Sequence, residues 1–107
     1  MLKQLEARTV SFDVGTDSTV VELADAPKHP VFRDTSGTLL LDAEGRLAGI
    51  DLRGSSGSGW VVMLRPHEEV ARSEPGRNVR VAFTADERPA VLRIPGARPR
   101  GAEMSIL

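Results

Sequence analysis

The chain has 107 residues and a formal net charge of −1, because 14 Lys and Arg are balanced by 15 Asp and Glu. This length predicts one domain with a single modest core, and the balanced charge argues against binding to nucleic acid or to an anionic membrane. The chain contains no cysteine, which excludes disulfides and cysteine-ligated metal sites. The N-terminal residues carry charges and no long apolar run, so we expect a cytoplasmic protein.

Apolar and polar residues alternate in the first part of the chain, a pattern typical of strands with one buried face. Residues 9–14 and 19–23 are predicted to form a hairpin that is closed by a short polar turn. Residues 24–37 contain Pro27 and Pro30 and are expected to form an ordered loop, since each proline removes a backbone donor. The sequence thus predicts a first hairpin followed by a crossing segment.

A second hairpin is predicted where two apolar runs flank a turn that contains Asp42 and Gly45. Its strands are residues 38–41 and 47–53, and the glycine can adopt the positive φ that closes a tight turn. The first of these strands contains three consecutive leucines, which are apolar on both faces. We therefore expect that strand to be central in the sheet or covered on both sides.

Three further strands are predicted at residues 60–65, 78–83 and 90–94. One short helical turn is expected over residues 66–72, where a proline and two glutamates suit the first turn of a helix. Pro89 begins the last of these strands, and it predicts an edge position because proline cannot donate to a ladder.

Two segments rich in glycine and polar residues interrupt or follow these elements. Residues 54–59 have the composition of a flexible linker, and in so small a domain they could equally be a hairpin loop. The domain is predicted to span residues 1–94, with residues 95–107 as a flexible tail. The apolar end of this tail is either a frayed terminus or a short docking peptide.

An internal repeat is suggested by the similarity of residues 19–54 to residues 60–96. A shift of 42 residues aligns four residues of the first half with identical types in the second: Ala43, Arg46, Ala48 and Gly54. True duplication and the general likeness of β hairpins both remain open explanations. The second turn has Glu87 where the first has Gly45, so we expect a function peculiar to this protein at the second hairpin.

These elements together predict an all-β fold of about seven short antiparallel strands. The strands would form a small sandwich or a partly open barrel, with the two related halves packed against each other.

No catalytic or metal-binding motif is found. His29 and His67 are the only histidines, and neither lies in the context of a catalytic triad or of a zinc-binding helix. Asp13, Asp17 and Asp42 lie at predicted turns, where carboxylates accept hydrogen bonds from backbone amides. We therefore expect no cofactor, no metal and no enzymatic activity.

The residues around these turns resemble the DUF2283 group, a family of small uncharacterised bacterial proteins. The resemblance covers residues 9–53 and includes Phe12-Asp13, Asp17, the apolar strand at 19–23, and an apolar run into the turn motif at 40–51. The chain departs from the family pattern in having Phe12 where tyrosine is frequent and in continuing well beyond Leu52. The resemblance implies a strand-and-turn framework and brings no reaction, cofactor or ligand.

Two hypotheses of function follow. The first is a protein-interaction or structural module that binds a protein partner or itself, with a homodimer as its simplest assembly. Its predicted interface residues are Trp60, Leu40, Met104, Ile106 and Leu107. The alternative is a receptor for a small ligand or nucleotide, in which arginines that are scattered along the sequence gather at the mouth of the barrel.

Overall fold

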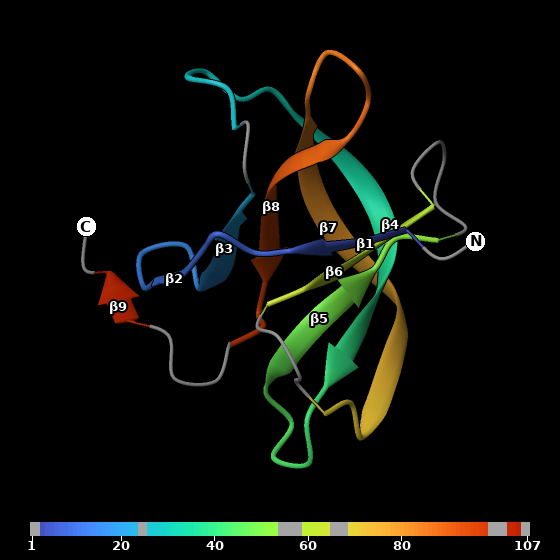
Figure 1. The fold of residues 1–107 in the computed structure, drawn as a ribbon. Helices are drawn as coiled ribbons and strands as arrows, with labels where there is room; N and C mark the ends of the chain where they lie inside the picture. Colours follow the sequence, from blue (N-terminus) through green and yellow to red (C-terminus); the bar gives the residue numbers. More distant parts are fainter. Residues whose placement is uncertain (1–2, 24–25, 54–58, 65–68, 99–102, 106–107) are drawn as a thin grey trace.

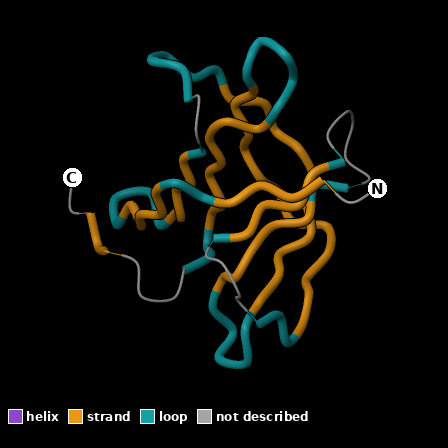
Figure 2. The backbone as a smooth tube through the Cα atoms, in the orientation of Figure 1, coloured by secondary structure: helices purple, strands orange, loops and turns teal. Residues whose placement is uncertain are grey.

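In a computed structural model that describes residues 3–23, 26–53, 59–64, 69–98 and 103–105, all regular structure is β-sheet (Figures 1 and 2). The described residues form nine strands: β1 (Lys3–Glu6), β2 (Thr9–Asp13), β3 (Ser18–Glu22), β4 (Phe32–Leu41), β5 (Leu47–Asp51), β6 (Trp60–Met63), β7 (Arg72–Phe83), β8 (Pro89–Pro95) and β9 (Glu103–Ser105). They form one sheet in the order β1-β6-β5-β4-β7-β8-β3-β2-β9. The predicted all-β fold is confirmed.

The sheet curls into a partly open barrel, which the N-terminal segment spans. β1 pairs in parallel with β6, and β2 pairs antiparallel with β3 from the other side of the sheet. Between the two strands, the amide of Ala7 donates to the carbonyl of Met63 at 2.9 Å, and that of Arg8 donates to Glu22 at 2.8 Å. One continuous segment therefore connects strands that lie far apart in the sheet order (Figure 1).

The interior of the curled sheet is filled by aliphatic side chains from β3, β4, β5, β6, β7 and β8. The core residues whose exposure is 1% or less are Val21, Leu39, Leu47, Ile50, Leu52, Val62, Val79, Val81, Leu92 and Ile94. A smaller cluster on the outer face of β7 and β8 contains Ala82, Ala90 and Val91, with Phe32 packed against it. Apolar and polar side chains alternate along these strands because one face of each strand is buried in the core.

Two strands are longer than the sequence predicts. β4 begins at Phe32 rather than at residue 38, and β7 begins at Arg72 rather than at residue 78. The added residues are mostly polar, so they lack the alternation that identifies a half-buried strand. They form strands because each lies beside the predicted part of the other strand: Phe32 is opposite Ala82, and Arg72 is opposite Leu41.

Two short strands were not predicted, and both pair in parallel. β1 lies beside β6, and β9 lies beside β2 in a region expected to be an irregular tail. The predicted strands, β2 to β8, pair antiparallel with one another as expected, and the parallel pairings are confined to these two added strands. The expected helical turn at 66–72 is also not found in its described part, because residues 69–71 have no regular structure and β7 begins at Arg72; residues 66–68 lie outside the described residues.

The edge position predicted from Pro89 was wrong. β8 lies between β7 and β3, and Pro89 is a buried residue at its start. The register shifts between Ala82 and Phe83, where Phe83 lies opposite Pro89. Proline is tolerated here because the first residue of a strand at such an irregularity does not have to donate to the ladder.

The leucine-rich part of β4 is central, as predicted, but it is covered on one side only. Leu39 and Leu41 are buried, whereas Leu40 is half-buried on the outer face. β4 lies between β5 and β7 in the sheet.

The turns that close the β4–β5 and β7–β8 hairpins have matching backbones. In the first, Asp42 and Arg46 are joined by an amide–carbonyl hydrogen bond of 2.9 Å; in the second, Thr84 and Arg88 are joined by one of 2.8 Å. Gly45 has φ +80° and Glu87, the residue at the same place, has φ +64°. The order of β6-β5-β4 also mirrors that of β3-β8-β7 across the sheet. Descent of the halves by duplication stays a prediction.

Asp13 gives a testable dependence of stability on pH. Hydrogen bonds from the Thr16 side chain and from the backbone amides of Gly15 and Thr16, together with the charge of Arg93, hold the pKa of Asp13 below its ordinary value despite desolvation. The carboxylate therefore stabilises the fold above the unfolded-state pKa of about 3.9, and this contribution is lost as the pH falls through the lower folded-state value. We expect Asp13→Asn to reduce the free energy of unfolding at neutral pH and to match the parent at strongly acid pH. Urea unfolding at both pH values measures this, and a deficit of equal size at both would contradict it.

Candidate functional site

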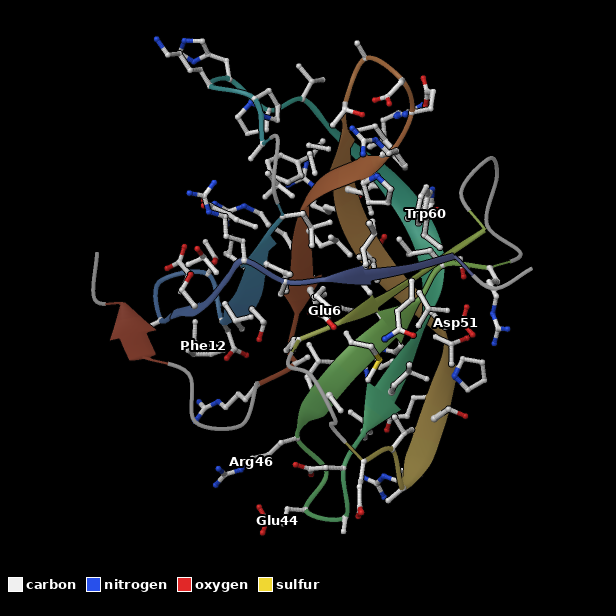
Figure 3. All side chains as sticks on the ribbon, in the orientation of Figure 1. Glu6, Phe12, Glu44, Arg46, Asp51 and Trp60 are labelled. Carbon is white, nitrogen blue, oxygen red and sulfur yellow. The ribbon has the colours of Figure 1, made fainter. Side chains whose placement is uncertain are left out.

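The structure does not bring the described residues of the predicted interface together at one place. Trp60 and Leu40 are half-buried, on β6 and β4 respectively (Figure 3). Met104 lies in β9, near the opposite end of the sheet order from β6. Ile106 and Leu107 lie outside the described residues. A single interface built from all five residues therefore has no support from their placement.

The residues considered for catalysis and metal binding are also separate. His29 is exposed in the segment before β4, and His67 lies outside the described residues. Within the described ranges, no group of three or more His, Asp or Glu side chains is arranged to hold a metal ion. The aspartates at the turns fulfil their predicted role at two positions: Asp13 Oδ1 accepts from the Gly15 amide, and Asp42 Oδ1 accepts from the amides of Glu44 and Arg46.

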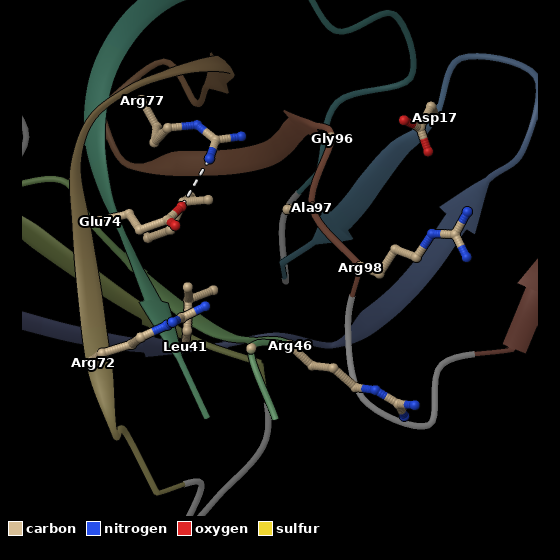
Figure 4. A pocket seen from close by; sticks show the side chains of 11 residues that line it. Asp17, Leu41, Arg46, Arg72, Glu74, Arg77, Gly96, Ala97 and Arg98 are labelled. Atoms are coloured by element: carbon tan, nitrogen blue, oxygen red, sulfur yellow. Dashed lines mark hydrogen bonds and ion pairs between the residues drawn. The ribbon is translucent and has the colours of Figure 1, made fainter. Parts of the chain in front are cut away.

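A pocket of about 450 Å³ lies at one end of the barrel, beside the turn of the β4–β5 hairpin (Figure 4). We call it the arginine mouth, and its lining residues are Asp17, Leu39, Leu41, Gly45, Arg46, Arg72, Glu74, Arg77, Gly96, Ala97 and Arg98. Leu39, Leu41 and Ala97 are buried and give the pocket an apolar floor. The mouth therefore combines four arginines with a surface of carbon.

One wall of the mouth is the first half of β7. The Arg72 guanidinium lies against Gly45, where a Cβ atom would be 3.2 Å from Arg72 Nη2. Arg77 Nη1 donates to Glu74 Oε2 at 2.8 Å, and its Nη2 donates to the carbonyl of Pro95 at 3.4 Å. Pairing of β7 with β4 brings these side chains to the mouth, since Arg72 lies opposite Leu41 and Glu74 opposite Leu39.

The other wall is the segment from Gly96 to Arg98, which follows β8. The Gly96 amide donates to the carbonyl of Asp17 at 2.8 Å, and the Leu47 amide donates to the carbonyl of Arg98 at 2.8 Å. The Thr19 hydroxyl donates to the carbonyl of Ala97. These bonds join the segment to the β2–β3 turn, β5 and β3, although the sequence predicts that the domain ends at residue 94.

Most of the positive charge at the mouth is not neutralised by neighbouring carboxylates. Arg77 pairs with Glu74, but within the described part of the chain no carboxylate lies within 4.0 Å of the guanidinium of Arg46, Arg72 or Arg98. Arg98 instead lies 5.0 Å from the Phe12 ring centroid. Elsewhere, five arginines each pair with a carboxylate: Arg33, Arg53, Arg80, Arg88 and Arg93. Apart from Arg8, the described arginines without a carboxylate partner therefore all line the mouth.

The turn of the second hairpin shows the difference between an arginine with a carboxylate partner and one without. Glu87 has the backbone position of Gly45 and pairs with Arg33 at 2.8 Å. The Arg33 guanidinium also lies 4.2 Å from the Phe83 ring centroid. At the first turn, glycine replaces the glutamate and the arginine beside it has no carboxylate partner among the described residues. The arginine at the first turn therefore differs from the one at the second in having no carboxylate beside it, and the expectation of a function at the second hairpin stays a prediction.

The arginine mouth could not be recognised from the sequence, because its cations come from positions 46, 72, 77 and 98. They are brought together by strand pairing and by the hydrogen bonds of the segment after β8. The one local signal was the difference between Gly45 and Glu87 in otherwise similar turns.

No protein-family model, curated protein or solved structure matches the chain. The resemblance to the DUF2283 group consequently stays a prediction. Among the described residues there is no helix that is long and apolar enough to cross a membrane.

Proposed function

We propose that the protein is a receptor domain that binds a small anionic ligand at the arginine mouth, without chemical conversion of the ligand. The observation that carries this proposal is the presence of Arg46, Arg72 and Arg98 around one pocket with no described carboxylate partner. Elsewhere on the barrel, most described arginines are paired, so the grouping at the mouth is not explained by the needs of folding.

The physical chemistry of the guanidinium group favours an oxyanion as the ligand. It presents several donors in a plane that matches carboxylate and phosphate oxygens, and it keeps its charge at all physiological pH values. A hydrogen bond to a charged group contributes about 1.5–3 kcal/mol. The pocket volume of about 450 Å³ lies within the range of about 300–1,000 Å³ that is typical of small-molecule sites.

The proposal is tested by calorimetric titration of pyrophosphate into the full chain at low ionic strength. We expect saturable binding with a Kd below about 1 mM, equivalent to a free energy beyond about −4 kcal/mol. Arg72→Gln should weaken binding about 10-fold to 100-fold, because one charged hydrogen-bonding group is removed. Arg53→Gln is the matched control, since Arg53 pairs with Asp51 away from the pocket. No saturable binding to the parent, or equal losses in both variants, would overturn the proposal.

Self-association through a sheet edge is a second candidate, and it retains the hypothesis of a protein-interaction module. The observation in its favour is that β1 and β9 end the described sheet, each paired on one side only. Such edges can add a strand from a second copy. Sedimentation velocity over a wide concentration range should then show a dimer, and a monomer throughout would exclude this candidate.

A further inference from the structure

We propose that the ligand of the arginine mouth is a phosphorylated polyol, the chemical class that includes sugar phosphates and mononucleotides. This inference rests on the proposed function and identifies its substrate class. It starts from a feature that anion binding alone leaves unexplained: the mouth contains two carboxylates, Asp17 and Glu74, beside its arginines.

Asp17 has a carboxylate that the fold does not use. The residue lies in the turn between β2 and β3 with φ +50°, and its backbone carbonyl accepts the hydrogen bond from Gly96. No described residue donates a hydrogen bond to its side chain, which is exposed at the mouth. An ionised carboxylate only accepts hydrogen bonds, and it repels a bare anion in the same pocket. It is suited to a ligand that also brings hydroxyl donors.

Glu74 is held in place by a partner that leaves part of its carboxylate available. Arg77 Nη1 donates to Oε2 at 2.8 Å, and the same guanidinium donates to the carbonyl of Pro95. A carboxylate has about four acceptor positions, so the Glu74 group can accept further bonds from a ligand. Because Arg77 is engaged in this pair, the arginines left for a phosphate are Arg46, Arg72 and Arg98.

Each wall of the mouth contributes both kinds of polar group, arginine and carboxylate. Figure 4 shows Arg72 and Glu74 on β7, whereas Arg98 and Asp17 lie across the pocket on the other wall. Between them are the buried side chains of Leu39, Leu41 and Ala97, against which the carbon face of a small ring can pack. The volume of about 450 Å³ is near the lower end for ligand sites, which favours one ring with its phosphate over a dinucleotide.

A bare inorganic anion or a simple dicarboxylate fits these residues less well. Either would be attracted by the arginines but would gain nothing from Asp17 and Glu74, which would oppose its binding. A structural role for the ion pair with Arg77 accounts for Glu74 but not for Asp17. A ligand that combines phosphate oxygens with hydroxyl donors uses all of these groups.

The test compares ribose 5-phosphate with inorganic phosphate by calorimetric titration of the full chain. We expect ribose 5-phosphate to bind at least about tenfold more tightly, as one hydrogen bond to a charged group would give. Asp17→Asn should weaken ribose 5-phosphate binding about tenfold. The same variant should leave phosphate binding unchanged or tighter, because a repelling charge is removed. Asparagine tolerates the positive φ of this position, so the turn should be kept.

Glu74→Gln provides an independent variant. It should also weaken ribose 5-phosphate binding, because a carboxylate acceptor is removed, and it should leave phosphate binding unchanged or tighter, because Arg77 is released from its ion pair. Equal affinities for the two probes, or changes of the same sign for both probes in Asp17→Asn, would overturn the assignment of a phosphorylated polyol while leaving anion binding intact. Absence of binding by either probe would overturn this assignment and the proposed function together. Thermal unfolding of each variant checks that it is folded.

Discussion

A Gly45→Glu variant should fold and should bind pyrophosphate about 30-fold more weakly than the parent, equivalent to about 2 kcal/mol. The introduced carboxylate would lie beside the Arg72 guanidinium, because a Cβ atom at this position is 3.2 Å from Arg72 Nη2. It would then act as an internal counterion and compete with the ligand. The natural precedent is Glu87, which has φ +64° and pairs with Arg33 at the corresponding place in the second turn.

Gly45→Gln is the matched control for this variant. Glutamine has nearly the size of glutamate and the same difficulty in adopting φ +80°, which costs about 1–2 kcal/mol of stability in either variant. It has no charge to neutralise Arg72. We expect the glutamine variant to retain most of the affinity. Equal losses of affinity in the two variants would show that bulk rather than charge is responsible, and would contradict the role given to Arg72.

Leu92→Ala should lower the free energy of unfolding by about 3 kcal/mol, within the range of about 2–5 kcal/mol seen when a buried leucine is truncated. Leu92 is fully buried in the barrel and lies between Val21 of β3 and Val81 of β7. Its removal therefore leaves a cavity in the middle of the half of the sheet that β7, β8 and β3 form. For a domain of this size, we expect the midpoint of thermal unfolding to fall by about 10–20 °C.

Val31→Ala provides the comparison for the core variant. The Val31 side chain is 80% exposed, so its truncation should change stability by no more than about 0.5 kcal/mol. Urea unfolding of both variants measures the difference. A cost below about 1 kcal/mol for Leu92→Ala would contradict a closely packed barrel interior.

The sequence predicts strands best where one face is buried by aliphatic side chains. Alternation identifies β3, β5 and the second half of β7 because residues such as Val21, Ile50 and Val81 must face the core. It fails for the first half of β4 and of β7, where the side chains are mainly polar and exposed. Each of those segments becomes a strand through backbone pairing with the apolar second half of the other strand, which is not visible in the segment alone.

The turns show which features can be predicted from the residues of the turn alone. Asp42 and Gly45 were correctly assigned to a tight turn, since the carboxylate accepts backbone amides and the glycine adopts φ +80°. The same reasoning did not anticipate that Glu87 adopts a positive φ as well. Backbone geometry at that position follows the hairpin in which it lies, and the glutamate gains an ion pair with Arg33.

The candidate site could not be predicted from the sequence for a different reason. Its arginines are distant in the chain, and they meet only because β7 pairs with β4 and because the segment after β8 is bonded to Leu47 and Asp17. A grouping of arginines of this kind depends on topology, which alternation and turn motifs do not specify. The hypothesis of arginines at a barrel mouth predicted the residue type, but it did not say which arginines gather there.

Binding of an anion at the arginine mouth is tested most directly by NMR of the arginine Nε–Hε groups during titration with pyrophosphate. The signals of Arg46, Arg72 and Arg98 should shift together and saturate, because these guanidinium groups would donate to the ligand. The signals of Arg33 and Arg53, which pair with Glu87 and Asp51, should stay in place. Absence of any shift, or uniform and unsaturable shifts of all arginine signals, would contradict the account.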